Sequence, residues 1–216
     1  MNFRKLGFSL LGTASLVGAG APASAAFIEA GDAGDLPGSA PSVSVAHRQI
    51  QGSLNANPFG PDAYDLVDLY RIRIASPTRF LVSTTGFDPF LVADPVLFLF
   101  DATGAAVAMN DDADGSQSLL AGLPAGFGRG VYFLGISFAG VEPTDGTDPL
   151  FDAFGDGSVL PAGVLAGWQG EPLTPNFDIP GAYLIDIRVP EPGTFALLML
   201  GLLGVAGARR TRPAAN

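Results

Sequence analysis

Asp94-Pro95-Val96-Leu97-Phe98-Leu99-Phe100-Asp101 has apolar side chains at five consecutive positions between Pro95 and Asp101. Because successive side chains of a strand point to opposite faces, this run predicts a central strand with one side on the core and the other under a loop. Asp101-Ala102-Thr103-Gly104 has the composition of a turn, and Ala105 to Met109 returns as the hairpin partner. We therefore expect the fold to be built around this hairpin.

Other short apolar segments have the alternation of half-buried strands. In residues 66–74, Tyr70, Ile72 and Ile74 share one face, whereas Arg71 and Arg73 share the other. Similar segments lie at residues 43–52, 79–84, 132–138 and 183–189, separated by Gly, Pro, Asp and Asn. The pattern predicts an all-β fold, with residues 26–189 forming a single β-sandwich domain.

Several strand and turn motifs follow one another along this domain. They are Ile50-Gln51-Gly52-Ser53-Leu54, Asp68-Leu69-Tyr70-Arg71-Ile72, residues 94–101 with Gly104, Asn110-Asp111-Asp112, and Gly130-Val131-Tyr132-Phe133-Leu134. Their order resembles the bacterial pre-peptidase C-terminal (PPC) domain family over roughly residues 43–138 and again at 181–189. The resemblance implies a jelly-roll-like β-sandwich that serves as an accessory module in secreted bacterial proteins, and it implies no protease.

The N-terminus has the three parts of a secretory signal peptide. Arg4-Lys5 is the positive region, Leu6 to Ala19 is the apolar stretch, and Ala23-Ser24-Ala25 is the small-residue cleavage site. Signal peptidase would remove residues 1–25, so that the mature chain begins at Ala26. The alternative is a membrane-spanning helix, but the stretch is short and contains glycines.

The C-terminal segment, residues 190–212, has three elements in order. Pro190-Glu191-Pro192 precedes the apolar run from Phe195 to Ala208, which is followed by Arg209-Arg210-Thr211-Arg212. As a helix, that run spans only about 21 Å, against roughly 30 Å for a hydrocarbon core. We expect a short apolar transmembrane helix whose arginines stay on the cytoplasmic side.

This order of elements resembles the PEP-CTERM sorting signal of Gram-negative bacteria, with Val189-Pro190-Glu191-Pro192-Gly193 at the motif position. The resemblance implies transient insertion into the inner membrane and recognition by exosortase, a membrane-embedded cysteine transpeptidase that removes the helix near the motif. The alternative is an uncleaved C-terminal anchor. Either alternative places the middle of the chain outside the inner membrane.

Composition excludes several classes of function. The chain has 21 acidic and 11 basic residues, a net charge of −10, and five of the basic residues lie in the terminal segments. A nucleic-acid partner is therefore not expected. The absence of cysteine excludes disulfides and thiolate chemistry, and His47 is the sole histidine. We predict that the protein is not an enzyme; the remaining catalytic alternative is a small hydrolase that uses paired acids.

The densest polar cluster is Asn110-Asp111-Asp112-Ala113-Asp114-Gly115, directly after a predicted strand. Ca²⁺ prefers six to eight oxygen ligands, and closely spaced carboxylates on a turn supply several. We therefore consider a Ca²⁺ site formed by Asn110, Asp111, Asp112 and Asp114, with Asp68 or Asp101 as further ligands if strand pairing brings them near. The alternative is a solvated acidic turn.

Residues 139–180 form a long segment that is rich in Gly, Pro and Asp, and we expect a surface excursion there. It contains Trp168, the only tryptophan. With Phe151, Phe154 and Phe177, Trp168 would form a glycan-binding platform if it were exposed; the alternative is that these rings pack down onto the sandwich.

Together these features predict a secreted, exosortase-processed, non-enzymatic protein of the outer envelope, cell surface or extracellular matrix. We expect an association with exopolysaccharide or biofilm, in which Ca²⁺ held by acidic loops bridges the protein to anionic polysaccharide.

Overall fold

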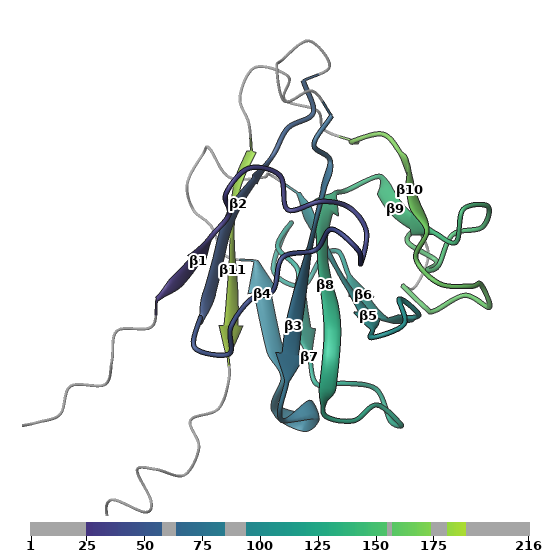
Figure 1. The fold of residues 1–216 in the computed structure, drawn as a ribbon. Helices are drawn as coiled ribbons and strands as arrows, with labels where there is room; N and C mark the ends of the chain where they lie inside the picture. Colours follow the sequence, from purple (N-terminus) through teal and green to yellow (C-terminus); the bar gives the residue numbers. More distant parts are fainter. Residues whose placement is uncertain (1–24, 58–63, 85–93, 155–156, 174–180, 189–216) are drawn as a thin grey trace, which may run out of the picture.

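The computed structural model describes residues 25–57, 64–84, 94–154, 157–173 and 181–188, in which almost all of the regular secondary structure is β-strand (Figure 1). The predicted signal peptide and the sorting segment, with Ala23, Pro190, Glu191, Arg209 and Arg210, lie outside these residues. Among the described residues, no helix has the length and apolar character needed to cross a membrane.

Two antiparallel sheets make up most of the fold. One has five strands in the order β1 (Ala26–Ile28), β2 (Gln49–Leu54), β11 (Gly181–Arg188), β4 (Leu81–Thr84) and β7 (Leu119–Ala121), of which β1 alone pairs in parallel, with β2. The other has four, in the order β3 (Val67–Ile74), β8 (Gly130–Phe138), β5 (Pro95–Asp101) and β6 (Ala106–Asn110). A short 3-10 helix, Pro77–Arg79, joins β3 to β4.

The two sheets pack face to face around one apolar core. Ile50 and Ile185 of the five-stranded sheet and Leu97 and Leu134 of the four-stranded sheet are fully buried in the same cluster. The inward row Tyr70, Ile72 and Ile74 lies in this cluster, as the alternation with Arg71 and Arg73 predicts. The predicted all-β sandwich is confirmed.

Strand β5 is covered on both faces, as its unbroken apolar run predicts. Leu97 and Leu99 face the core between the sheets, whereas Phe98 and Phe100 belong to a second apolar cluster on the outer face of the four-stranded sheet. The predicted hairpin with β6 also forms. Its turn is stabilised by the Asp101 carboxylate, which accepts hydrogen bonds from the backbone N–H groups of Thr103 and Ala105.

The covering layer comes from residues 139–173, which we expected to form a surface excursion. Instead β9 (Val141–Thr144) and β10 (Gly167–Gly170) pair with each other beside the four-stranded sheet (Figure 1). Leu150, Phe151 and Leu165 are buried in one cluster with Phe98 and Phe100. The expectation of a surface excursion was therefore wrong for the described part of this segment. Its spaced apolar side chains close the face that β5 would otherwise expose to water.

A predicted strand from Val43 to Gly52 begins later in the structure. Strand β2 starts at Gln49, because the His47 N–H donates to the Ser44 carbonyl and closes a turn at residues 44–47. Val43 is nevertheless buried, and its N–H donates to the Arg71 carbonyl.

Candidate functional site

Asp94, Asp111 and Asp112 bring three carboxylates together at one end of the four-stranded sheet, with one oxygen of each within 4.8 Å of the others. Asp94 directly precedes β5, and Asp111 and Asp112 directly follow β6. Because Leu97 pairs with Asn110 in the antiparallel hairpin, the end of β6 lies beside the start of β5. The hairpin register thus creates this cluster, which we call the hairpin cluster.

The electrostatics of the hairpin cluster are those of crowded anions. Burial, followed by repulsion from Asp94 and Asp112, raises the pKa of Asp111 to about 6. Burial and then Asp112 also raise the pKa of Asp94. The Asp111 Oδ1 atom is buried and has no hydrogen-bond partner. A cation would relieve the repulsion and satisfy this oxygen.

Further oxygens gather beneath the cluster around the buried hydroxyl of Ser118. The carbonyl oxygens of Pro95, Asn110 and Asp111 lie 2.6, 2.8 and 2.6 Å from Ser118 Oγ. A serine hydroxyl has one proton, so it donates to one of these carbonyls at a time. The environment next to the three carboxylates is therefore rich in oxygen acceptors and poor in donors.

The structure brings only part of the predicted Ca²⁺ ligand set together. Asp101 caps the turn at the other end of β5, and Asp68 lies at the start of β3. The Asn110 side chain accepts a hydrogen bond from the Leu119 N–H, while Asp114 pairs with Gln117 and is exposed. The idea that strand pairing adds Asp68 or Asp101 to this cluster was wrong, because antiparallel β5 carries Asp101 away from it. Asp94 takes that place.

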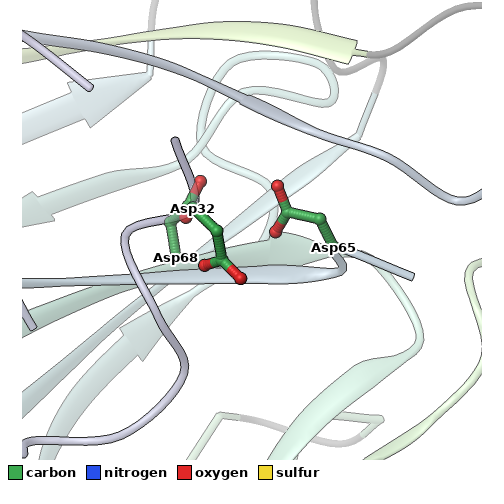
Figure 2. Close-up of side chains that lie close together, drawn as sticks. All are labelled: Asp32, Asp65 and Asp68. Carbon is green, nitrogen blue, oxygen red and sulfur yellow. The ribbon is translucent and has the colours of Figure 1, made fainter. Parts of the chain in front are cut away.

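A second group of acids, Asp32, Asp65 and Asp68, lies at the start of β3, again with oxygens within 4.8 Å of one another. Figure 2 shows Asp32 reaching from the loop after β1 to Asp68 on β3, with Asp65 on the same side. Asp68 is 0% exposed. Its Oδ1 accepts from the Ala33 N–H at 3.2 Å, and its Oδ2 accepts from the Tyr183 hydroxyl at 2.6 Å.

Asp68 is a neutral carboxyl of the core at neutral pH. Burial, followed by the charge of Asp65, raises its pKa to about 9, against the lowering effect of the Tyr183 hydrogen bond. A hydrogen bond with the Glu29 carboxyl contributes to the increase. The Tyr183 hydroxyl is also hydrogen-bonded to that of Tyr70, so one chain of polar groups links the two sheets across the core.

Trp168 both packs on the second apolar cluster and borders a pocket. Its ring contacts Phe98 and Phe100 edge-on, with centroids 5.4 and 6.2 Å apart, and its Nε1–H donates to the Asp35 carbonyl at 2.8 Å. A pocket of about 180 Å³ opens beside it. The pocket is lined by Asp35, Tyr64, Leu66, Val67, Val141, Trp168, Gln169 and Gly170.

The expected aromatic platform does not form as a whole. Phe151 is buried under the layer, Phe154 is 72% exposed, and Phe177 lies outside the described residues. Tyr64, which the sequence analysis did not single out, is 53% exposed beside Trp168 and has a backbone φ of 62°. For a tyrosine this left-handed conformation is strained, and such strain concentrates at functional positions.

Comparison with known proteins identifies the C-terminal segment. Residues 188–210 match the PEP-CTERM protein-sorting motif. The match begins at Arg188, where β11 ends. It marks a protein that is exported and processed by exosortase at the membrane on its way towards the cell surface.

The domain has a similar solved structure. The pre-peptidase C-terminal domain of a collagenase from Bacillus anthracis is 13% identical, with a TM-score of 0.35, over 76% of this chain and 96% of that one. No curated protein matches the chain.

Proposed function

We propose that the protein is a secreted, exosortase-processed binding protein of the cell envelope or extracellular matrix, and that it is not an enzyme. The observation that supports secretion and exosortase processing is the sorting motif at residues 188–210, which begins where the last strand of the sandwich ends. We also propose a role in biofilm or exopolysaccharide, which such sorting and the acidic composition of the chain support. The sandwich then serves as a rigid support for acidic groups at its edges.

Replacing Pro190, Glu191 and Pro192 together by alanine is expected to block release, because the exosortase substrate motif is lost. The variant accumulates in the membrane fraction at its uncut mass, whereas the wild-type chain does not. Glu171→Ala, at an exposed acid outside the motif, is the matched control and should be released normally. Normal release of the triple variant would contradict the proposal.

Two features of the acids favour binding over hydrolysis. The hairpin cluster holds carboxylate oxygens within 4.8 Å, closer than the separations of roughly 5–9.5 Å that glycosidases use. Asp68, with its raised pKa, is fully buried and out of reach of a substrate. Asp94, Asp111 and Asp112 line neither the pocket beside Trp168 nor a second pocket beside His47.

The hairpin cluster is the proposed Ca²⁺ site. Three carboxylates, an unsatisfied buried oxygen at Asp111 and nearby backbone carbonyls match the hard-oxygen preference of this ion. Asp94, Asp111 and Asp112 would hold the ion, and its remaining coordination positions would accept oxygens of an anionic polysaccharide. Bridging of this kind would link the protein to the matrix without any enzymatic step.

Saturating Ca²⁺ is expected to raise the melting temperature by about 5–10 °C, because an ion at 100 times its Kd contributes roughly 2.7 kcal/mol. Asp94→Asn combined with Asp111→Asn should abolish this gain and raise the melting temperature without Ca²⁺, because repulsion is relieved. Asp114→Asn, in the same loop but outside the cluster, should keep the full gain. An equal Ca²⁺ response in the double variant and the wild type would overturn the site.

A glycan-binding function is the second candidate, favoured by the pocket beside Trp168. Its volume of about 180 Å³, the exposed Tyr64 ring and the polar groups of Asp35 and Gln169 suit a single sugar unit. An oligosaccharide that binds there should change the emission of Trp168, and Tyr64→Ala should remove the change. Phe154→Ala, an exposed aromatic outside the pocket, should have no effect. Unchanged emission across neutral and acidic oligosaccharides would exclude this function.

A further inference from the structure

Exposed arginines gather at one end of the sandwich. Arg73 lies near the end of β3, Arg79 lies just before β4, Arg129 precedes β8, and Arg188 ends β11. We call this end, defined by Arg73, Arg79, Arg129 and Arg188, the arginine end. These four are among only six basic residues between the two terminal segments of an otherwise strongly acidic chain.

The strand register places the four arginines together. Arg73 pairs with Val131, two residues after Arg129, and Arg188 pairs with Leu81, two residues after Arg79. The link from β3 to β4 is only six residues, 75–80, so the two sheets meet at this end. In Figure 1, β3 and β11 both end at the lower edge of the sandwich.

A small pocket between the sheets joins the two sides of the arginine end. It has a volume of about 40 Å³, and its lining includes Val43, His47, Arg73, Phe80, Ile187 and Arg188. The Nδ1 atom of His47 is buried and has no hydrogen-bond partner within the described structure. The end thus combines cationic groups, an apolar surface and an unsatisfied imidazole nitrogen.

Few acids compensate these cations. In the described part of the chain, none of the four arginines forms an ion pair with a carboxylate. Two described acids near this end are already engaged: Asp186 accepts from Gln49 Nε2, and Asp101 caps its turn. The hairpin cluster lies at the far end of β8, which spans nine residues, or roughly 27 Å, and Asp68 of the second acidic group pairs with Ile136 near the same end.

The chain leaves the domain for the sorting segment from the same end. Six residues, 189–194, separate Arg188 from the apolar run that begins at Phe195. An extended chain of this length reaches at most about 20 Å. When the apolar run is inserted, the arginine end is therefore the part of the domain held nearest to the membrane surface.

We propose that the arginine end docks on the phosphate groups of anionic lipids in the membrane that holds the C-terminal segment. This inference rests on the membrane insertion in the proposed function. Arginine binds phosphate oxygens with a planar, two-pronged arrangement of donors. Four arginines at one end, two of which (Arg73 and Arg188) line a small pocket, match a headgroup surface. Docking would orient the domain and keep residues 189–193 at the membrane surface, where exosortase cuts.

Anionic lipids attract the arginine end but repel the domain as a whole, which has a net negative charge. Screening by salt determines which of the two interactions dominates. At physiological ionic strength the Debye length is about 8 Å, so the hairpin cluster, roughly 27 Å away, is screened from the lipid surface. The arginines act only once the tether has brought them within that distance. The processed protein, without its tether, should therefore not bind anionic vesicles and is free to leave.

The test uses the exported chain purified from membranes of producing cells that lack exosortase and reconstituted into vesicles. Because the chain has no cysteine, Thr78→Cys at the arginine end and Ala113→Cys near the hairpin cluster give single labelling sites. Each carries an environment-sensitive fluorophore, and headgroup spin-labelled lipids act as quenchers. Vesicles of phosphatidylcholine alone are compared with vesicles that also contain phosphatidylglycerol.

We expect the Thr78 label to be quenched more strongly when phosphatidylglycerol is present, with loss of this increase at about 0.5 M salt. The Ala113 label should show no such dependence. Changing Arg73, Arg79, Arg129 and Arg188 together to glutamine should remove the increase while the chain stays inserted. If the chain resists carbonate extraction and the Thr78 label does not respond to phosphatidylglycerol, the docking proposal is overturned alone. If carbonate extracts the chain, membrane insertion and docking both fail.

Discussion

Phe98→Ala is expected to lower the free energy of unfolding by about 3–5 kcal/mol, because it leaves a cavity between β5 and its covering layer. Phe98 is fully buried and contacts Phe100, Phe151 and Trp168, so one ring joins the sheet to residues 139–173. The measurement is urea unfolding, followed by the emission of the single tryptophan.

Phe154→Ala provides the matched control for this prediction. Phe154 lies in the same layer but is 72% exposed, so its loss should change the free energy of unfolding by less than about 0.5 kcal/mol. If Phe98→Ala were as mild as this control, the layer would not be an integral part of the fold.

The second large effect concerns the pH dependence of stability. Asp68 has a pKa of about 9 in the folded protein and an ordinary value of 3.8. Between these values the folded state keeps a proton that the unfolded state releases, so the contribution of Asp68 to stability is greatest below about pH 4 and falls as pH rises towards 9. The slope expected from this one group is at most about 1.4 kcal/mol per pH unit.

Asp68→Asn isolates the contribution of this carboxyl to the pH dependence of stability from the contributions of all other titrating groups. Asparagine keeps the neutral shape of the protonated acid, so the variant should lose most of the slope and be more stable than the wild type at pH 9. Asp114→Asn, at an exposed acid, should leave the slope unchanged. The slope of the free energy of unfolding against pH is measured for each variant by urea unfolding at a series of pH values, with a chelator present. An equal slope in Asp68→Asn and the wild type would contradict a buried neutral Asp68.

Much of the fold could be predicted because strand patterns are local. The double-sided apolar run at Val96 to Phe100 indicated the central strand and a cover on its outer face, and the alternation around Tyr70 indicated its buried row. The layer itself was not predicted. Its apolar residues, such as Leu150 and Leu165, are spaced irregularly among Gly, Pro and Asp, so they have no period that would identify a packed segment.

The candidate site was predicted only in part, for a related reason. Asp111 and Asp112 are neighbours in sequence, whereas Asp94 joins them through the hairpin register. That register was available in the sequence, because Asp94 precedes the same strand whose partner ends at Asn110. The group of Asp32, Asp65 and Asp68 depends on a loop folding back onto β3, which no local pattern reveals.

The central claim, export followed by exosortase processing, is tested most directly by the intact mass and cell fraction of the protein from producing cells, with and without exosortase. We predict that the enzyme-containing cells release a chain that lacks both residues 1–25 and the apolar C-terminal run, whereas cells without the enzyme retain that run in the inner membrane. A chain that keeps its C-terminal run in the inner membrane even when exosortase is present would contradict the claim.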